Sequence, residues 1–177
     1  MEQYPGLSFW LEVKALKAAG ASATELWLSE DKRTTIGLSL EQALEIMAFE
    51  LGSNLQDVCW RCQNLLRRQA RIPLPLHREI LLLPVADKGA EGYVVNSRIV
   101  MYEAVAENRG ETRLFFDDGT TANYSISISE FRQLITEGQI LHKAYWGLYL
   151  ISNRGDSLKE VPVVFYGMGK GGMVNSA

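Results

Sequence analysis

The hydrophobic pattern of this chain changes its period near Pro73, and this change constrains the fold more than any other sequence feature. In residues 40–70, just before Pro73, apolar residues recur at helical spacing, for example on a stripe that comprises Leu40, Leu44, Met47 and Leu51. After Pro73, short segments rich in β-branched and aromatic residues alternate with turn residues. Helices and strands in separate parts of a chain are typical of the α+β class. We therefore predict one α+β domain with short β-hairpins, an antiparallel sheet and a helical pair.

The first half is predicted to begin with a helix and a hairpin. LSFWLEVKALKAA (7–19) has helical spacing and stops at Gly20, a residue type that commonly follows a helix end. TELWLS (24–29) and RTTIGLS (33–39) alternate like paired strands, with EDK as the turn between them.

Two helices are predicted next. Ser39 can cap the first helix, which continues to Leu51, and Gly52-Ser53 ends it. The second helix is predicted over 54–70, because the RIPLP segment contains prolines that cannot continue a helix.

The second half is predicted to be mostly strands. HREILLLPV (77–85) has the apolar character of a buried strand, and YVVNSRIVMYEAVA (93–106) fits one strand or two that meet at Asn96-Ser97. Asp118-Gly119 suits the tight turn of a hairpin between TRLFF and TTANYSI.

A last helix is predicted from a capping box at Ser127 and Glu130, and Gly138 can interrupt it. PVVFYG (162–167) is predicted to add a strand, and GMGKGGMVNSA to form a flexible tail. The predicted organisation is an N-terminal helix over 1–23, a core over 24–151, and a C-terminal strand and tail over 152–177.

Composition and charge exclude several classes of protein. The net charge is −3 and the sequence pI about 5.5, whereas nucleic-acid-binding domains are more often basic. Two cysteines make no disulfide framework, which indicates a reducing compartment. No apolar run approaches the about 18–20 residues that cross a bilayer, and the acidic start is not a secretory leader. We therefore expect a cytoplasmic protein without a membrane partner.

Cys59 and Cys62, in the sequence CWRC, are open to redox chemistry, metal binding or plain packing. A redox pair needs a thiolate at a helix N-terminus, whereas this pair is predicted mid-helix. Zinc needs four ligands, and His77 and His142 lack paired histidine spacing. Helical spacing places both cysteines on the apolar stripe, so we predict buried small hydrophobes and expect no metal or cofactor.

Positive charge is concentrated in one segment despite the net negative charge. Residues 58–78 contain five arginines and no Asp or Glu. On a helix, one face gathers Trp60, Arg61, Asn64, Arg67, Arg68 and Arg71. Such a face is most often simply solvated, but an exposed tryptophan favours a partner, and guanidinium and amide donors suit phosphate oxygens and base edges.

The helical pair also loosely matches a helix-turn-helix. Ala48, Gly52 and Val58 take its small, turn and buried positions, although Ser53 and Arg61 stand where it prefers apolar residues. We therefore predict an interface with double-stranded DNA. Its candidate residues are Arg61, Asn64, Arg68 and Arg71 on the duplex, Arg67, Arg78 and Ser53 on phosphates, and Trp60 among them.

The order of these motifs over residues 24–145 resembles the ComK family of competence transcription factors of Gram-positive bacteria. The matching features are the Gly52-Ser53 turn, the basic helix with Arg61, Arg67, Arg68 and Arg71, the strand bracketed by Pro73 and Pro84, and the hairpin glycine Gly119. Asp57-Val58 departs from the family, which tends to carry Gly-Arg there.

The resemblance implies an activator of competence genes that binds A/T-rich promoter boxes, whose narrow minor grooves attract arginines. It also implies control through a proteolytic adaptor protein, and paired boxes favour a homo-oligomer. The Asp118-Gly119 hairpin is also similar to LytTR-type DNA-binding domains, which would move the DNA contacts toward Arg98 and Arg113.

Two other classes of function compete with this interpretation. An enzyme is not expected, because GMGKGG lacks the Ser/Thr and the helix of a phosphate-binding loop, and neither histidine has a local nucleophile. The stronger alternative is a regulator that keeps the fold but binds another protein. The net charge, Asp57 and the C-terminal region outside the resemblance favour it, and the acidic helix that carries Glu41, Glu45 and Glu50 would supply a charged docking surface.

Overall fold

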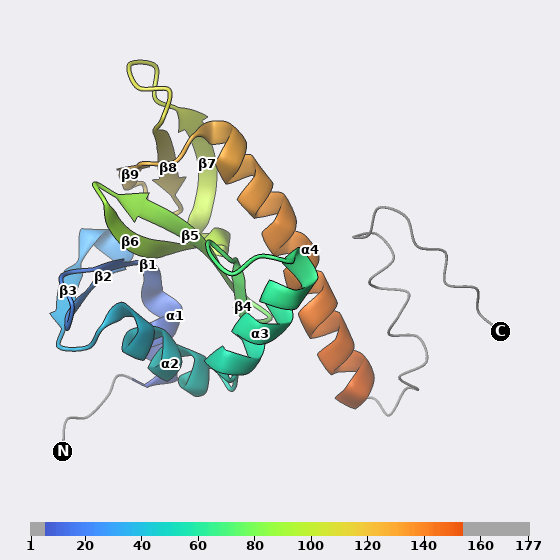
Figure 1. Cartoon of the computed structure of the whole chain (residues 1–177). Coiled ribbons are helices and arrows are strands. Elements are labelled where there is room, and N and C mark those ends of the chain that lie inside the picture. Colours follow the sequence, from blue (N-terminus) through green and yellow to red (C-terminus); the bar gives the residue numbers. More distant parts are fainter. Residues whose placement is uncertain (1–5, 154–177) are drawn as a thin grey trace.

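The computed structural model describes residues 6–153, which form a six-stranded sheet, a three-stranded sheet and four α-helices (Figure 1). The larger sheet contains β1 (Val13–Ala18), β2 (Thr24–Leu28), β3 (Arg33–Ile36), β4 (Leu74–His77), β5 (Ile80–Asp87) and β6 (Ala90–Val95) in the order β3-β2-β1-β6-β5-β4. The smaller sheet contains β7 (Ile99–Ala104), β8 (Thr112–Phe116) and β9 (Thr121–Tyr124) in that order. Neighbouring strands are antiparallel throughout both sheets. The prediction of a single α+β domain is confirmed.

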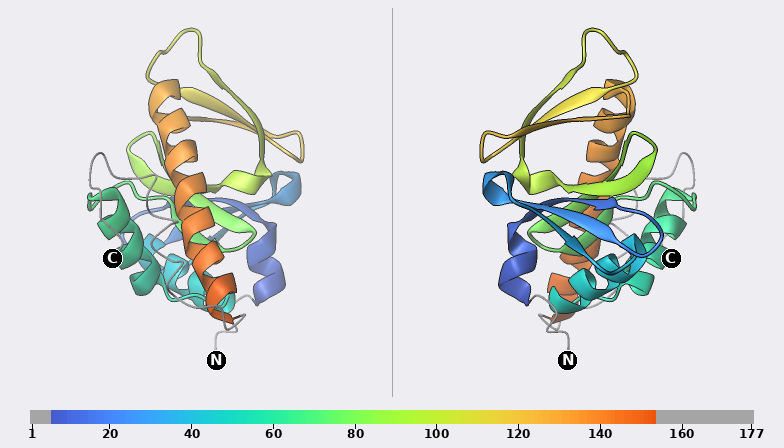
Figure 2. Two further views of the ribbon diagram at one scale, coloured as in Figure 1. Left: turned by 90° about the vertical axis from the view of Figure 1, so that its right-hand side faces the viewer. Right: turned by 90° about the vertical axis from the view of Figure 1, so that its left-hand side faces the viewer.

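The four helices are α1 (Leu7–Glu12), α2 (Leu40–Glu50), α3 (Leu55–Leu66) and α4 (Ile128–Asn153), and two short 3-10 turns, η1 (Ser29–Asp31) and η2 (Asn96–Arg98), join strands. The helices α1, α2 and α3 lie on one side of the larger sheet and the smaller sheet lies on the other (Figures 1 and 2). The long helix α4 crosses from the smaller sheet to α3 (Figure 1).

The larger sheet is buried on both faces, which explains the continuous apolar run of β5. Leu82 and Val95 belong to the core shared with α2 and α3, whereas Leu83 and Val94 belong to the core shared with the smaller sheet. Helix α4 contributes to both cores. A strand with two covered faces loses the polar alternation of a half-exposed strand.

The predicted helix over 7–19 is wrong. Only Leu7–Glu12 is helical, and Val13–Ala18 is β1, paired with β2 on one side and with β6 on the other. Pairing on both edges outweighs the helical preference of Ala, Leu and Lys in this segment. Gly92 permits the close approach of β6, because a Cβ there would overlap the carbonyl oxygen of Leu16. The region predicted as a separate N-terminal helix thus supplies a central strand of the sheet.

Other boundaries also differ from prediction. The predicted strand 77–85 corresponds to β5, which begins at Ile80 and continues through Pro84 to Asp87, and His77 instead ends β4, its hairpin partner. Of the two options for 93–106, the structure has two strands, β6 and β7, in different sheets with η2 between them. Helix α4 is not interrupted at Gly138, because this glycine lets α4 lie against Leu81 and Leu83 of β5.

The predicted caps at Ser39 and Ser127 and the predicted hairpins are confirmed, whereas Gly20 follows the strand β1 and not a helix. Ser39 forms a reciprocal capping box with Gln42 at the start of α2, and Ser127 forms one with Glu130 at the start of α4. Gly119 has a φ of +83° in the β8–β9 turn, a conformation that favours glycine. The predicted hairpin of β2 and β3 is present as well. The predicted strand over 162–167 and the tail lie outside the described residues.

Candidate nucleic-acid interface

Helix α3 has an apolar side and a polar side, and both follow from the spacing of its residues. The Asn54 side chain accepts a hydrogen bond from the Asp57 N–H at 3.0 Å and caps the helix. Leu55, Val58 and Cys62 are buried in the core. Trp60, on the opposite side, is 65% exposed.

Both cysteines behave as the apolar residues that the sequence predicts. They are free thiols, Cys62 is buried and Cys59 is half-buried against the same core. Burial raises the pKa of Cys62 to about 12, so its thiolate is scarce at neutral pH. Among residues 6–153 no group of three or more His, Cys, Asp or Glu could hold a metal ion.

Four of the predicted site residues lie together on α3 and its end, and we call them the α3 face: Trp60, Arg61, Asn64 and Arg67, all exposed. Arg61 pairs with Asp57 one turn earlier, Nε to Oδ1 at 3.1 Å, and its guanidinium carbon lies 5.6 Å from the Tyr145 ring centroid. Arg67 ends the helix with a left-handed backbone (φ 54°). Within the described part of the chain, Arg67 has no ion pair.

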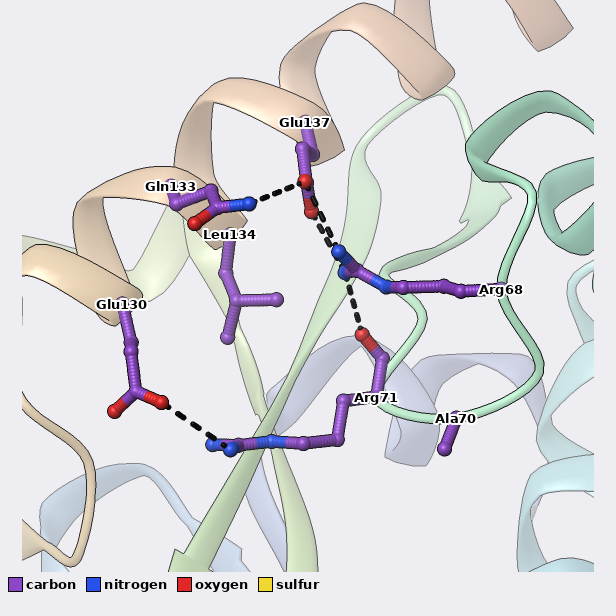
Figure 3. A pocket seen from close by; sticks show the side chains of 7 residues that line it. All are labelled: Arg68, Ala70, Arg71, Glu130, Gln133, Leu134 and Glu137. Carbon is purple, nitrogen blue, oxygen red and sulfur yellow. Dashed lines mark hydrogen bonds and ion pairs between the residues drawn. The ribbon is translucent and has the colours of Figure 1, made fainter.

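Arg68 and Arg71 do not continue this face, which corrects the predicted helix over 54–70. The helix stops at Leu66, and both arginines lie in the loop toward β4, where they meet α4 (Figure 3). The Arg68 guanidinium donates to both Glu137 carboxylate oxygens, at 3.0 and 2.6 Å. Arg71 Nη1 lies 3.7 Å from Glu130 Oε1. The Arg68–Glu137 pair is partly buried and ties the loop to α4, whereas the Arg71–Glu130 pair is about half exposed and holds Arg71 only weakly.

The remaining predicted residues lie apart from the α3 face. The Ser53 hydroxyl donates to the carbonyl oxygen of Leu76, so it fixes the α2–α3 connection to β4. Arg78 is exposed in the β4–β5 turn. Arg98, in η2, pairs with Asp117 at 3.0 Å and donates to Ser29, and Arg113 pairs with Glu103 on the neighbouring strand. The predicted set is therefore several separate sites, not one continuous ridge.

A groove between α3 and α4 borders the α3 face, and we call it the α3–α4 groove. Its volume is about 230 Å³, and it is lined by Trp60, Arg61, Cys62, Asn64, Leu65, Leu141, Ala144 and Tyr145. The Tyr145 hydroxyl donates to Asp57 Oδ2 at 3.4 Å, and burial raises the pKa of Tyr145, which keeps this donor protonated. This groove is not among the sites predicted from the sequence, although Leu141, Ala144 and Tyr145 have the i, i+3, i+4 spacing of one helix face.

The helical pair keeps the three helix-turn-helix positions expected from the sequence. Ala48 and Val58 are fully buried, and Gly52 has a φ of +77° in the turn. A helix-turn-helix joins its two helices by a short turn that often contains glycine, and residues 51–54 with Gly52 are compatible with that connection.

The fold and the site define a class: a single α+β domain with a helical pair on one side of an antiparallel sheet and a cationic, aromatic surface on the second helix. Comparison of the chain with protein-family models, with curated proteins and with solved structures finds no significant match. None of the helices in residues 6–153 combines the length and the apolar character needed to span a bilayer. The resemblance to the ComK family stays a prediction.

Proposed function

We propose that this protein is a DNA-binding transcriptional regulator and that the α3 face is its contact with the duplex. The observation that carries the proposal is the exposure of two arginines, an asparagine and a tryptophan on the second helix of a helix-turn-helix-like pair. Arginine and asparagine donate to phosphate oxygens and base edges, and the tryptophan adds an apolar contact.

The pairing of Arg61 with Asp57 does not remove Arg61 from this surface. Both side chains are about half exposed, and exposed ion pairs of this kind contribute less than about 1 kcal/mol. A phosphate can therefore replace the carboxylate at little cost. Arg68 differs, because its bidentate pair with Glu137 is partly buried, so we assign it a structural role.

The finer features of the proposal derive from the resemblance to the ComK family. They are a preference for A/T-rich boxes, activation of competence genes, a homo-oligomeric state, a proteolytic adaptor as partner and a cytoplasmic location. A narrow A/T-rich minor groove concentrates negative potential, which suits an interface that depends on few arginines.

A regulator that binds another protein instead of DNA is the second candidate. The α3–α4 groove favours it, because four of its lining residues, Cys62, Leu65, Leu141 and Ala144, are small or aliphatic. A peptide that inserts an apolar side chain would use this groove, whereas DNA would use the charged rim.

A salt titration separates the two candidates. We expect the full chain to bind an A/T-rich duplex in fluorescence anisotropy, with an affinity that falls steeply as salt rises. The double substitution Arg61→Ala/Arg67→Ala should weaken binding and reduce the slope of log K against log salt by about 0.9 for each lost phosphate contact. A matched control, Arg109→Ala/Arg132→Ala, removes the same charge from two exposed arginines, one in the β7–β8 connection and one in α4.

The control should leave both the affinity and the slope close to those of the unchanged chain. Binding that is no tighter than micromolar at low salt, or that responds equally to both double substitutions, would overturn the proposal in favour of the second candidate.

A further inference from the structure

The α3–α4 groove has the size of a site for one side chain. Its volume of about 230 Å³ is below the about 300–1,000 Å³ of small-molecule pockets. Trp60 at its rim is 65% exposed, and Leu65 is only half-buried. An open apolar groove beside an exposed tryptophan is typical of a surface that another segment covers.

The chain beyond α4 starts close to this groove. Tyr145 lies eight residues before Asn153, the last residue of α4, which corresponds to about 12 Å of helix. Eight residues after Asn153, the sequence reaches Val161, and such a stretch extends up to about 26–29 Å. The chain is therefore long enough to turn back along α4 and reach the groove.

The sequence that arrives there is apolar. VPVVFYG (161–167) is an unbroken run of six apolar or aromatic residues that ends at Gly167, and Glu160 directly precedes it. We propose that residues 161–167, which lie outside the described residues, dock into the α3–α4 groove of their own chain and cover Trp60. Phe165 supplies the side chain for the groove, and Glu160 supplies a carboxylate for Arg61 at the rim.

Docking would cover part of the α3 face, because Trp60, Arg61 and Asn64 belong to both surfaces. The segment and the duplex would then compete, so the segment would lower DNA affinity; this consequence rests on the proposed function, whereas docking itself does not.

The test measures the exposure of Trp60 in the full chain without DNA. The chain has four tryptophans, so the contribution of Trp60 is obtained by subtracting the signal of the Trp60→Phe variant. Phe165→Asp should raise the acrylamide quenching constant of Trp60 about twofold. This increase is expected if about half or more of the molecules have the segment docked and the substitution releases it from the groove. The matched control, Met173→Asp, places the same charge in the same region outside the segment and should change nothing. Thermal unfolding followed by circular dichroism verifies that both variants keep the fold.

Equal quenching in the unchanged chain and in Phe165→Asp would overturn the proposal. Quenching that depends on protein concentration, together with a dimer in sedimentation velocity, would assign the groove to a second copy and overturn docking within one chain. DNA binding is measured separately on the same variants. If Phe165→Asp exposes Trp60 but the protein does not bind DNA, docking stands and the proposed function fails.

Discussion

Replacing Asp118 with asparagine tests the charge pair that joins the two sheets. Lys14, on β1, has no exposed surface, and its Nζ lies 2.6 Å from Asp118 Oδ2 and 2.5 Å from Thr120 Oγ1. Asp118 and Thr120 belong to the β8–β9 turn of the smaller sheet. The ammonium group also lies 4.1 Å from the Trp27 ring centroid and 5.2 Å from that of Phe116. A neutral residue at position 118 leaves this buried cation without its counter-charge.

The structure sets the size of the expected loss. Removing one partner of a buried ion pair costs about 3–5 kcal/mol, because the other charge stays buried. Asparagine keeps one oxygen that can accept from Lys14, so we expect Asp118→Asn to lower the free energy of unfolding by about 2–4 kcal/mol. Lys14→Met removes the charge but keeps an unbranched side chain. It should cost less, about 1–2 kcal/mol, because Asp118 keeps its hydrogen bonds from the Thr120 and Glu30 N–H groups.

The same pair predicts a dependence on pH. Burial alone would raise the pKa of Asp118, but hydrogen bonds from Lys14 and Thr120 and the charge of Lys14 lower it below its usual range. A folded-state pKa below the unfolded value of about 3.9 means that the stabilisation is complete above about pH 5, where the carboxyl is ionised in both states. It is lost as the pH falls through the folded-state pKa. The difference between the unchanged chain and Asp118→Asn should therefore be constant from about pH 5 to pH 8 and shrink in acid.

Urea unfolding followed by circular dichroism at several pH values measures these differences. Glu103→Gln is the control, because it breaks the exposed Arg113–Glu103 pair and should cost less than about 1 kcal/mol. If Asp118→Asn costs no more than this control at pH 7, the pair does not hold the sheets together and the reasoning from burial is refuted.

Three further predictions concern packing and reactivity. Gly92→Ala should lower the free energy of unfolding by about 1–3 kcal/mol in urea, because its Cβ meets the Leu16 backbone; an unchanged midpoint would contradict this. Glu137→Gln should cost about 1–2 kcal/mol in the same assay, because it breaks the partly buried pair with Arg68; a neutral result would return Arg68 to the DNA surface. Cys62 should react with iodoacetamide at pH 8 about a thousandfold more slowly than an ordinary thiol, as followed by mass spectrometry, because its pKa is about 12; labelling at the ordinary rate would reopen a redox role.

Local rules sufficed for the turns and helix starts of this protein. Ser39 with Gln42, Ser127 with Glu130, and Gly119 act through neighbours at most three residues away, so their roles are visible in the sequence. The side of α3 that carries Cys62 follows equally from helical spacing. These features need no knowledge of the remainder of the chain.

The segment 13–18 shows where local rules fail. Its residues favour a helix in isolation, but its strand conformation depends on β2 and on β6, which begins more than seventy residues later. The burial of Lys14 is not visible in the local sequence either, because its partner Asp118 is 104 residues away. Interactions at such separations override propensity, and nothing within the segment itself indicates them.

The arginine cluster depends partly on local helical spacing and partly on contacts with a distant element. Arg61 is available because α3 presents it to solvent, which the helical period predicts, and Arg67 is exposed at the C-cap of α3. Arg68 and Arg71 belong to the same run of charge, but α4 crosses opposite them with Glu130 and Glu137, seven residues apart and therefore on one face of that helix. A run of arginines in the sequence gives the number of positive charges in a region. The element that packs against the region determines how many of those charges are paired. Of the two arginines that α4 pairs, only Arg68 is held in a partly buried pair, so Arg61 and Arg67 on the α3 side of the run remain exposed.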